Sequence, residues 1–513
     1  MLFRSLDPVI DQGRVWILAE GRQVYTIREN GVVTGKGQTS VKNPSLVVPD
    51  GLGRALVSDG SSAAELMNQQ GKLVWSLKLN GKLALPPFFD RQGALYLCTG
   101  GNIVVYTPAG KPREFFALPG AQPRFVSPVR IDGEDLLLVG LAGDAGGARV
   151  LLLSGERRVT KEWQLSGMPS LVSCTARGFV AVIGNTVWTA NWQDEAAKQL
   201  YNFASPIIDC SLTEDSLLVL LANRTIALLS DGKLAWQVQT KLSVPANVKL
   251  AQERVFVYSN SMIQSFSLAG ELFRELSVSN STTRLVPGLS GNVFSGGTDW
   301  IVYVYQFEPL TSPDSMPRND TSLQELTKAL QQELFWLSSG YTDVSFIPVL
   351  EEVRQALAKL QPISRRNKLM LLALAAAPDT DGIPDPEKNL SIPLRANACR
   401  LLGALGDPAS IPFLINVAVS ETDETLVSAA LDAVADISID PTDTALTRLA
   451  RDFRITQSVE AAYALIRCVT TLVRSQGNAK NLDALALLAK LQDQRFPDSV
   501  RKKAQEAFAS LLR

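Results

Sequence analysis

The chain has 513 residues, of which 46% are apolar, with 50 lysines and arginines against 51 aspartates and glutamates. This length exceeds what one ordinary core of roughly 150 residues needs, so a single small domain is excluded and several folding units or a repetitive architecture are expected. The balanced charge lacks the basic excess that binding to phosphates requires, so we expect no nucleic-acid partner.

The sequence contains no histidine. Histidine titrates nearest to neutral pH among the side chains and is the commonest transition-metal ligand. Its absence excludes the Ser-His-Asp and Cys-His mechanisms and the zinc and haem sites that use imidazole. We therefore expect no catalytic residues and no cofactor, although carboxylate and lysine chemistry stay open.

Five cysteines are scattered along the chain, and their number is odd. No two of them form a Cys-x-x-Cys pair, so we expect small buried side chains rather than disulfides. The five are Cys98, Cys174, Cys210, Cys399 and Cys468.

The longest strongly apolar stretch covers residues 369–377. A membrane-spanning helix needs about 20 such residues, so no membrane span is expected. The first residues also lack the basic and then apolar pattern of a secretion signal. The sequence therefore predicts either a cytoplasmic protein or a chain given without its leader.

Residues 1–307 repeat with a period near 40. Within one repeat, apolar runs at residues 94–98, 103–106 and 113–118 are separated by turn residues, and with the run beside each proline this predicts four short strands. A four-stranded sheet cannot bury both faces alone, so we expect eight of them to stack radially as an all-β, eight-bladed propeller. The repeats are marked by Pro8, Pro44, Pro87, Pro128, Pro169, Pro206, Pro245 and Pro287.

The last repeat lacks a fourth strand after residues 300–306. Residues 1–6 precede Pro8 much as residues 272–276 precede Pro287. We therefore expect this N-terminal segment to supply the outer strand of the last blade and to close the ring.

Two phrases in this region carry a resemblance. Residues 71–75 (Gly-Lys-Leu-Val-Trp) and 232–236 (Gly-Lys-Leu-Ala-Trp) match the Gly-Lys-x-x-Trp phrase of quinoprotein-like (PQQ-like) eight-bladed propellers. The repeat style is similar to that of the BamB family of outer-membrane assembly lipoproteins. The resemblance implies that Trp75 and Trp236 dock between neighbouring blades.

Other repeats depart from this phrase, so some blade junctions must pack differently. The sequence also lacks the long loop insertions and the adjacent cysteine pair of the quinoprotein dehydrogenases, so the resemblance concerns the fold and implies no redox activity. The residues roughly in place of the docking tryptophan are Phe115 or Phe116, Trp163, Leu200 and Phe273.

Residues 308–320 hold three prolines and no apolar periodicity, which predicts a linker. Leucines at helical spacing over residues 323–337 then begin an all-α domain at residues 321–513. Segments rich in small residues and the turn at residues 405–414 resemble HEAT repeats, which stack as a solenoid. The resemblance implies that Asp407 caps a helix and that Pro408 lies in its first turn.

Two charged segments are candidate binding sites. Asp379, Asp381 and Asp385 have a spacing used by calcium loops, but the distal glutamate is not at its proper distance, although Glu387 is near. We favour a solvated loop and keep calcium as the alternative. Residues 365–368 (Arg-Arg-Asn-Lys) are interpreted as a solvated helix face, with a phosphate site as the alternative.

Because neither half shows a catalytic constellation, the predicted function is a non-enzymatic scaffold. Other proteins would bind the propeller faces and the concave surface of the helical repeats, and the linker would join two surfaces for multivalent capture. The BamB-like resemblance implies a periplasmic location, in a bacterial cell-envelope or outer-membrane assembly complex. A cytoplasmic regulatory adaptor and a propeller that binds a small ligand such as a quinone are the alternatives.

Overall fold

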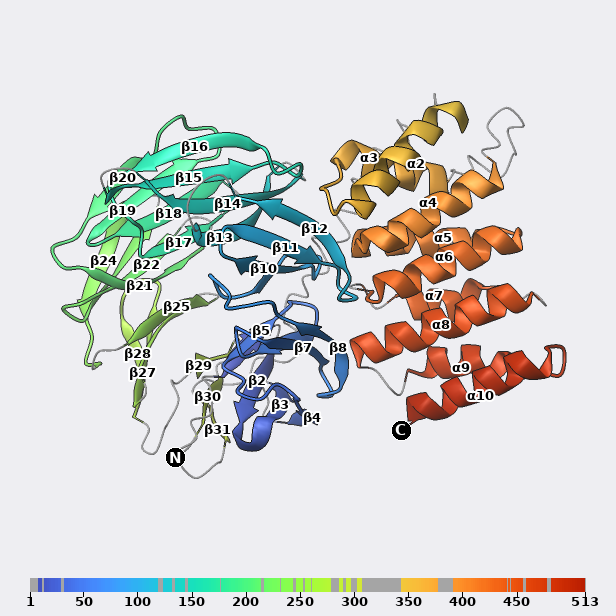
Figure 1. The fold of residues 1–513 in the computed structure, drawn as a ribbon. Coiled ribbons are helices and arrows are strands. Elements are labelled where there is room, and N and C mark those ends of the chain that lie inside the picture. Colours follow the sequence, from blue (N-terminus) through green and yellow to red (C-terminus); the bar gives the residue numbers. More distant parts are fainter. Residues whose placement is uncertain are drawn as a thin grey trace.

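The computed structural model describes residues 8–306, 343–376 and 391–512, with short gaps in the first and last of these ranges. Figure 1 shows sheets arranged around an axis on one side and stacked helices on the other. The strands end at Gln306 and the first described helix begins at Asp343. The predicted linker at residues 308–320 and the predicted helix at residues 323–337 lie outside the described residues.

Seven four-stranded antiparallel sheets follow one another along the chain as blades 1 to 7. Blades 1 to 4 contain β1 (Val9–Asp11), β2 (Arg14–Ala19), η1 (Glu20–Arg22), β3 (Gln23–Arg28) and β4 (Val33–Gln38); β5 (Leu46–Pro49), β6 (Arg54–Ser58), β7 (Ala63–Asn68) and β8 (Leu73–Lys78); β9 (Phe88–Phe89), β10 (Leu95–Thr99), β11 (Asn102–Tyr106) and β12 (Pro112–Ala117); β13 (Pro123–Ile131), β14 (Glu134–Ala142), β15 (Ala148–Leu153) and β16 (Val159–Leu165). Blades 5 to 7 contain β17 (Leu171–Cys174), β18 (Gly178–Ile183), β19 (Thr186–Asn191) and β20 (Lys198–Asn202); β21 (Ile207–Leu212), β22 (Ser216–Leu221), β23 (Thr225–Ser230) and β24 (Lys233–Gln239); β25 (Asn247–Ala251), β26 (Arg254–Tyr258), β27 (Met262–Ser267) and β28 (Leu272–Ser277).

The last sheet corrects one prediction. It contains three described strands, β29 (Val286–Pro287), β30 (Asn292–Gly296) and β31 (Val302–Gln306). The structure therefore shows a propeller with seven complete blades, and the prediction of eight blades is wrong, because no fourth strand joins this sheet among the described residues. Residues 1–6, predicted to be that strand, lie outside the described residues.

Apolar packing nevertheless places the three-stranded sheet between blade 7 and blade 1. Phe294 of β30 is fully buried against Val15 and Ile17 of blade 1. The neighbouring Val293 packs against Phe256 and Ile263 of blade 7. Successive residues of β30 point to opposite faces, so one strand contacts both neighbouring blades and closes the ring.

The position of a strand within a blade explains its sequence. Every residue of β6 is buried, because an inner strand has a neighbouring blade on each face. In β24, the outermost strand of blade 6, exposed and half-buried residues alternate. This difference is why the middle strands are continuous apolar runs whereas the outer strands carry charged residues.

Tryptophans on three outer strands lie at the junctions between blades. Trp75 donates its indole N–H to the carbonyl of Pro108 in the next blade, at 2.9 Å. A Cβ on Gly110 would lie 2.8 Å from the Trp75 ring, so only glycine permits this approach. Trp236 bonds to Leu268 in the same way, at 2.6 Å, and Trp163 to the carbonyl of Asp194, at 2.9 Å.

Nine α-helices lie within the described ranges 343–376 and 391–512. They are α2 (Asp343–Ala358), α3 (Arg365–Ala376), α4 (Ile392–Leu405), α5 (Ile411–Ser420), α6 (Glu424–Ile437), α7 (Ala445–Asp452), α8 (Val459–Gln476), α9 (Leu482–Lys490) and α10 (Asp498–Leu512), with the short η4 (Pro408–Ser410) before α5. None of these helices combines the length and apolar character needed to span a membrane.

The helices form two layers, in which α2, α4, α6, α8 and α10 pack in succession and α3, α5, α7 and α9 pack beside them. Small residues let neighbouring helices of one layer approach closely. A Cβ on Gly403 of α4, for example, would lie 2.7 Å from the Cα of Ala433 in α6. Asp407 caps η4 by accepting the N–H of Ala409 at 3.0 Å, and Pro408 follows it, as the sequence predicts.

We expect Trp75→Ala to lower the free energy of unfolding by about 2–3 kcal/mol, less than the ~3–5 kcal/mol of a fully buried tryptophan. The variant loses ring packing at a blade junction and leaves the Pro108 carbonyl without the indole donor. Urea unfolding of the full chain measures the change. Phe273, roughly in the same place on β28, is 55% exposed, so Phe273→Ala should cost less than about 1 kcal/mol; equal losses for the two variants would contradict this role of Trp75.

Candidate functional site

The helical unit packs against blades 2 and 3 through the ends of its helices (Figure 1). This contact, the seam, is formed on the propeller side by the turns at residues 68–71 and 107–111 and by β12. On the helical side it is formed by the C-terminal ends of α2, α4, α6 and α8. Carbonyl groups at a helix C-terminus have no partner inside the helix, so these ends need donors from elsewhere.

Two amide side chains from blade 2 supply donors to the end of α8. Asn68 donates Nδ2–H to the carbonyl of Arg474 at 2.8 Å. Gln69 donates Nε2–H to the carbonyl of Gln476 at 2.7 Å. The turn holds Asn68 in place, because its Oδ1 accepts the backbone N–H groups of Gln70 and Lys72. Blade 2 therefore caps α8 with a preformed turn.

Two helices end at glycines that lie in close contact with the propeller. Gly406 follows α4 with a φ of 65° and Gly477 follows α8 with a φ of 72°. A Cβ on Gly406 would lie 2.6 Å from Thr107, and one on Gly477 would lie 2.9 Å from Gln69. Glycine is thus required at both positions for two reasons, because the backbone is left-handed and because the propeller leaves no room for a Cβ.

The ends of α6 and α2 are bound differently. Lys111 places its ammonium 2.6 Å from Asp436 in the last turn of α6, where a positive charge also complements the helix dipole. Arg467 of α8 binds the same carboxylate at 2.8 Å. Beyond α2, the carbonyl of Leu360 accepts the backbone N–H of Phe115, on the outer strand of blade 3, at 2.8 Å.

A buried ion pair lies behind these contacts. Arg54 and Asp50 of blade 2 are both inaccessible to solvent, and the Arg54 Nε lies 2.6 Å from the carboxylate. Arg54 also donates to the carbonyl of Pro108 at 3.0 Å and to the hydroxyl of Ser475 at 3.2 Å. One side chain thus joins blade 2, blade 3 and α8.

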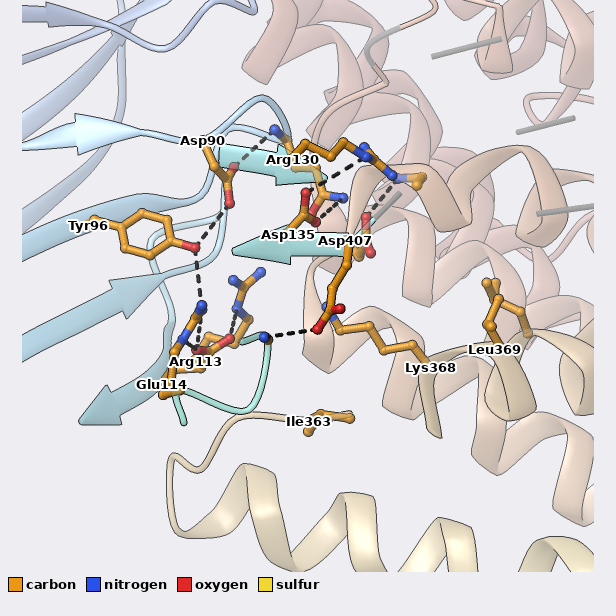
Figure 2. A pocket seen from close by; sticks show the side chains of 16 residues that line it. Asp90, Tyr96, Arg113, Glu114, Arg130, Asp135, Ile363, Lys368, Leu369 and Asp407 are labelled. Carbon is orange, nitrogen blue, oxygen red and sulfur yellow. Dashed lines mark hydrogen bonds and ion pairs between the residues drawn. The ribbon is translucent and has the colours of Figure 1, made fainter. Parts of the chain in front are cut away.

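The seam also contains a partly open cavity of about 90 Å³, bordered by blades 3 and 4 and by α3 and η4 (Figure 2). Its volume has room for several water molecules or one small ligand. Most of its lining is charged. The lining residues are Asp90, Gln92, Tyr96, Arg113, Glu114, Arg130, Glu134, Asp135, Gly155, Arg157, Ile363, Lys368, Leu369, Leu372, Asp407 and Ala409.

Glu114 is the centre of an ion cluster in the cavity wall. Arg157 approaches it at 2.7 Å and the Nε of Arg113 at 3.2 Å, and all three side chains are less than 10% exposed. Burial opposes ionisation of Glu114, but Arg157 and Arg113 outweigh it, so its pKa is lowered. Arg157 also contacts the hydroxyl of Tyr96 at 3.5 Å, and burial raises the pKa of that phenol.

Asp90 has the opposite shift. Desolvation raises the pKa of its carboxyl to about 6, with Arg113 opposing the change and Asp135 adding to it. The Oδ1 of Asp90 accepts the N–H groups of Gln92 and Ala94, both at 2.9 Å, which fixes the turn between β9 and β10. Asp90 is therefore a carboxyl group of the seam whose pKa lies well above its usual range.

The structure separates the charges predicted at residues 365–368. Arg366 is exposed to solvent, whereas Lys368 lines the cavity. The side chain of Arg365 is outside the described set. The candidate calcium loop, with Asp379, Asp381, Asp385 and Glu387, likewise lies outside the described residues.

The five cysteines are free; Cys98, Cys399 and Cys468 are buried, and Cys174 and Cys210 are half-buried. Burial raises the pKa of all five thiols, which makes them poor nucleophiles. Within the described part of the chain, no three acidic or cysteine side chains are grouped so that they could hold a metal ion.

Sequence reasoning missed the seam and its ion cluster. The sequence held one signal in the outer strand β12, where two charges, Arg113 and Glu114, directly precede Phe115. The structure buries both charges and exposes Phe115. A strand that exposes phenylalanine and buries charges indicates a covered polar contact. No local signal connects Asn68 with Arg474, because 406 positions separate them.

No protein-family model matches the sequence, and no curated protein matches it significantly. Solved propellers do match. BamB from Moraxella catarrhalis is 12% identical, with a TM-score of 0.43, over 60% of this chain and 98% of that one. Sqt1 from Saccharomyces cerevisiae is 9% identical, with a TM-score of 0.47, over 60% and 97%. The computationally designed protein Ika8 is 12% identical, with a TM-score of 0.45, over 60% and 97%. At these values the likeness is one of fold, and no function is transferred from it.

Gly406→Ala should destabilise the chain by more than its backbone strain alone. A left-handed alanine costs roughly 1–2 kcal/mol, and overlap with Thr107 should add at least about 1 kcal/mol. Gly184 is the matched control, because its φ is 62° and a Cβ there would meet nothing within 4 Å. Urea unfolding of the full-length variants compares the two losses, and a loss for Gly406→Ala no larger than for Gly184→Ala would contradict the close contact at the seam.

Asp90→Asn should remove part of the pH dependence of stability. Burial raises the pKa of Asp90 in the folded state to about 6, above the 3.8 of an ordinary aspartate, so the folded state holds this proton more tightly than the unfolded state. Its contribution to stability is present below pH 4 and is lost as the pH rises through 6. Between pH 7.5 and pH 5 the wild type should therefore gain stability relative to Asp90→Asn, which keeps Oδ1. If the free energy of unfolding changed equally between pH 7.5 and pH 5 in the two proteins, the raised pKa of Asp90 would be contradicted.

Proposed function

We propose that this chain is a non-enzymatic protein-interaction scaffold in which the propeller and the helical unit act as one rigid body. The observation that supports the proposal is the seam, where donors from blades 2 and 3 bind the ends of α2, α6 and α8. The sequence suggested two surfaces joined by a linker, but direct contacts set their orientation in the structure. A partner would then meet two surfaces at a fixed angle, without the entropy cost of ordering a linker.

The partner surfaces in this proposal are the propeller faces and the exposed side of the helices. Apolar side chains support the helical part, since Tyr463 of α8 is 38% exposed and Leu482 at the start of α9 is 80% exposed. We also propose that the helices are HEAT-like repeats. The two-layer packing, the cap at Asp407 and the glycine contact between α4 and α6 support that assignment.

For the location, we propose the periplasm or cell envelope of a bacterium, with a role in an envelope assembly complex. The support is the pair of Gly-Lys-x-x-Trp phrases at residues 71–75 and 232–236. Cell fractionation of the native protein with N-terminal sequencing tests the location. Recovery from the cytosol with Met1 as the native start would favour the adaptor alternative.

The scaffold proposal is tested by capture of partners with the intact chain and with a seam variant. Asn68→Asp with Gln69→Glu places two carboxylates opposite the carbonyls at the negative end of α8, so the seam should open. The control is Asn185→Asp with Gln239→Glu, which removes amide donors to the carbonyls of Phe203 and Asn223 within blades 5 and 6 and changes the charge equally.

We expect the wild type and the control to retain a stoichiometric protein partner, and the seam variant to bind it at least about tenfold more weakly. Circular dichroism verifies that all three proteins are folded. Equal retention by the seam variant would refute the rigid-body mechanism. If the purified protein captured no specific partner and showed the absorption band of a stoichiometric cofactor, the ligand-binding alternative would be supported in place of the scaffold function.

A further inference from the structure

Blades 1 and 2 carry four exposed cationic side chains at the ends of their strands that lie away from the seam. This end, the far rim, is formed by residues 20–23, 39–43, 59–63 and 78–83. It is opposite to the seam because β7 begins there at Ala63 and reaches α8 at Asn68, about 17 Å further along the strand. The four cationic residues of the far rim are Arg22, Lys42, Lys78 and Lys82.

Contacts between the two blades bring the first two cations to the same place. Arg22 donates from its Nη1 to the carbonyl of Ser40 at 3.3 Å. The backbone N–H of Ser40 in turn donates to the carboxylate of Glu65 in blade 2, at 3.0 Å. Lys42 follows two residues later in the same connection. The connection from blade 1 to blade 2 is therefore held at both sides, with Arg22 and Lys42 on its exposed surface.

The other two cations come from blade 2. Lys78, the last residue of β8, is paired with Ala63 of β7. Ala63 and Glu65 point to the same face of the sheet, because they are two residues apart in a strand, so Lys78 lies on the face that meets blade 1. The connection that carries Lys82 binds the carbonyl of Gly60 at 2.9 Å. All four cations thus belong to one rim that spans two blades.

The accessible charge of the described far rim is positive. None of the four cations forms a salt bridge with any other described residue. Glu65 is only 5% exposed, so its charge is withdrawn from the surface. Asp59 is half-buried and accepts the N–H groups of Ser61 and Ser62, at 2.8 Å and 2.7 Å. The side chain of Glu20 lies outside the described set. Four exposed cations therefore stand against the single accessible carboxylate of Asp59.

The uncharged part of the far rim is polar. None of the large apolar side chains that are exposed in the described chain lies within residues 39–63 or 78–83. Insertion into a membrane needs such apolar side chains, and binding of single-stranded nucleic acid uses exposed aromatic rings. Carboxylates accept hydrogen bonds from ammonium, hydroxyl and amide groups alike, so they suit this surface. Its exposed polar residues are Gln38, Ser40, Asn43, Ser61 and Asn80.

We propose that the far rim of blades 1 and 2 binds an acidic protein segment, whose aspartates and glutamates pair with the four cations. This proposal rests on the scaffold function and narrows it, because it gives one propeller face a partner of defined chemistry. The chain as a whole has a net charge of -1, so an acidic partner is attracted by the rim and not by the whole molecule. Such a local charge orients the partner as well as attracting it.

The test is the binding of fluorescein-labelled decaglutamate to the full chain, followed by fluorescence anisotropy. At 50 mM KCl we expect saturable binding with one site per chain, and at 300 mM KCl weaker binding, because salt screens exposed charges. In the double variant Lys42→Gln with Lys78→Gln, the affinity should fall about threefold to tenfold. The matched control is Lys233→Gln with Lys502→Gln, which removes two exposed lysines from β24 and α10. It changes the net charge equally and should bind as the wild type does.

Two competitors test the class of the partner. Single-stranded DNA or phosphatidylserine vesicles that bind more tightly than decaglutamate, through the same two lysines, would overturn the assignment to an acidic protein. No saturable binding of decaglutamate at 50 mM KCl, or equal losses in the two double variants, would refute the rim. Capture of a protein partner separates this failure from that of the scaffold function. A partner that the wild type and the Lys42→Gln, Lys78→Gln variant retain equally would exclude the rim and leave the scaffold standing.

Discussion

Unpaired carbonyl groups at helix ends are the constraint on which the arrangement of this molecule depends. In the stack of α2, α4, α6 and α8, successive helices present their C-terminal ends to the same side, so their unpaired carbonyls and their negative dipole ends lie in one row. In an isolated helical unit, these carbonyl groups would accept hydrogen bonds from water. Here two amides from the blade 2 turn bind carbonyls at the end of α8. Lys111 of the blade 3 turn pairs with the Asp436 carboxylate in the last turn of α6, and the backbone N–H of Phe115 binds the carbonyl of Leu360 just beyond α2.

Apolar packing stabilises each unit but does not join them. In the described residues, the largest hydrophobic cluster contains only helical-unit side chains, from Phe346 to Leu511, and the other clusters contain only propeller side chains. The seam is therefore held by hydrogen bonds and by ions such as Arg54 and Asp50. A buried ion pair contributes little net stability, because desolvation offsets the attraction, but leaving one member unpaired is costly. A polar seam thus specifies one orientation more strongly than it adds stability.

The propeller could be predicted because its sequence is periodic. The seam could not, because its contacts join residues that are far apart in the sequence. Strands such as β10 and β11 follow from alternating apolar runs and turn glycines, because both signals are local. The cap formed by Asp407 is equally local. The partners of Asn68 and Gln69 are not, since they are backbone carbonyls more than 400 positions away, and a carbonyl leaves no residue type to recognise. Counting repeats also misled, because a proline marks the start of the last sheet whether or not a fourth strand completes it.

One turn couples the ring to the helices. The turn at residues 107–111 accepts two donors from blade 2 at the Pro108 carbonyl, from the indole of Trp75 and from Arg54. The same turn contacts Gly406 through Thr107 and binds Asp436 through Lys111. A shift between blades 2 and 3 must therefore move the contacts to α4 and α6. Because the turn is fixed from both sides, the packing of blades 2 and 3 constrains the angle between the two units. A perturbation at the Trp75 junction therefore reaches the ends of α4 and α6 through this turn.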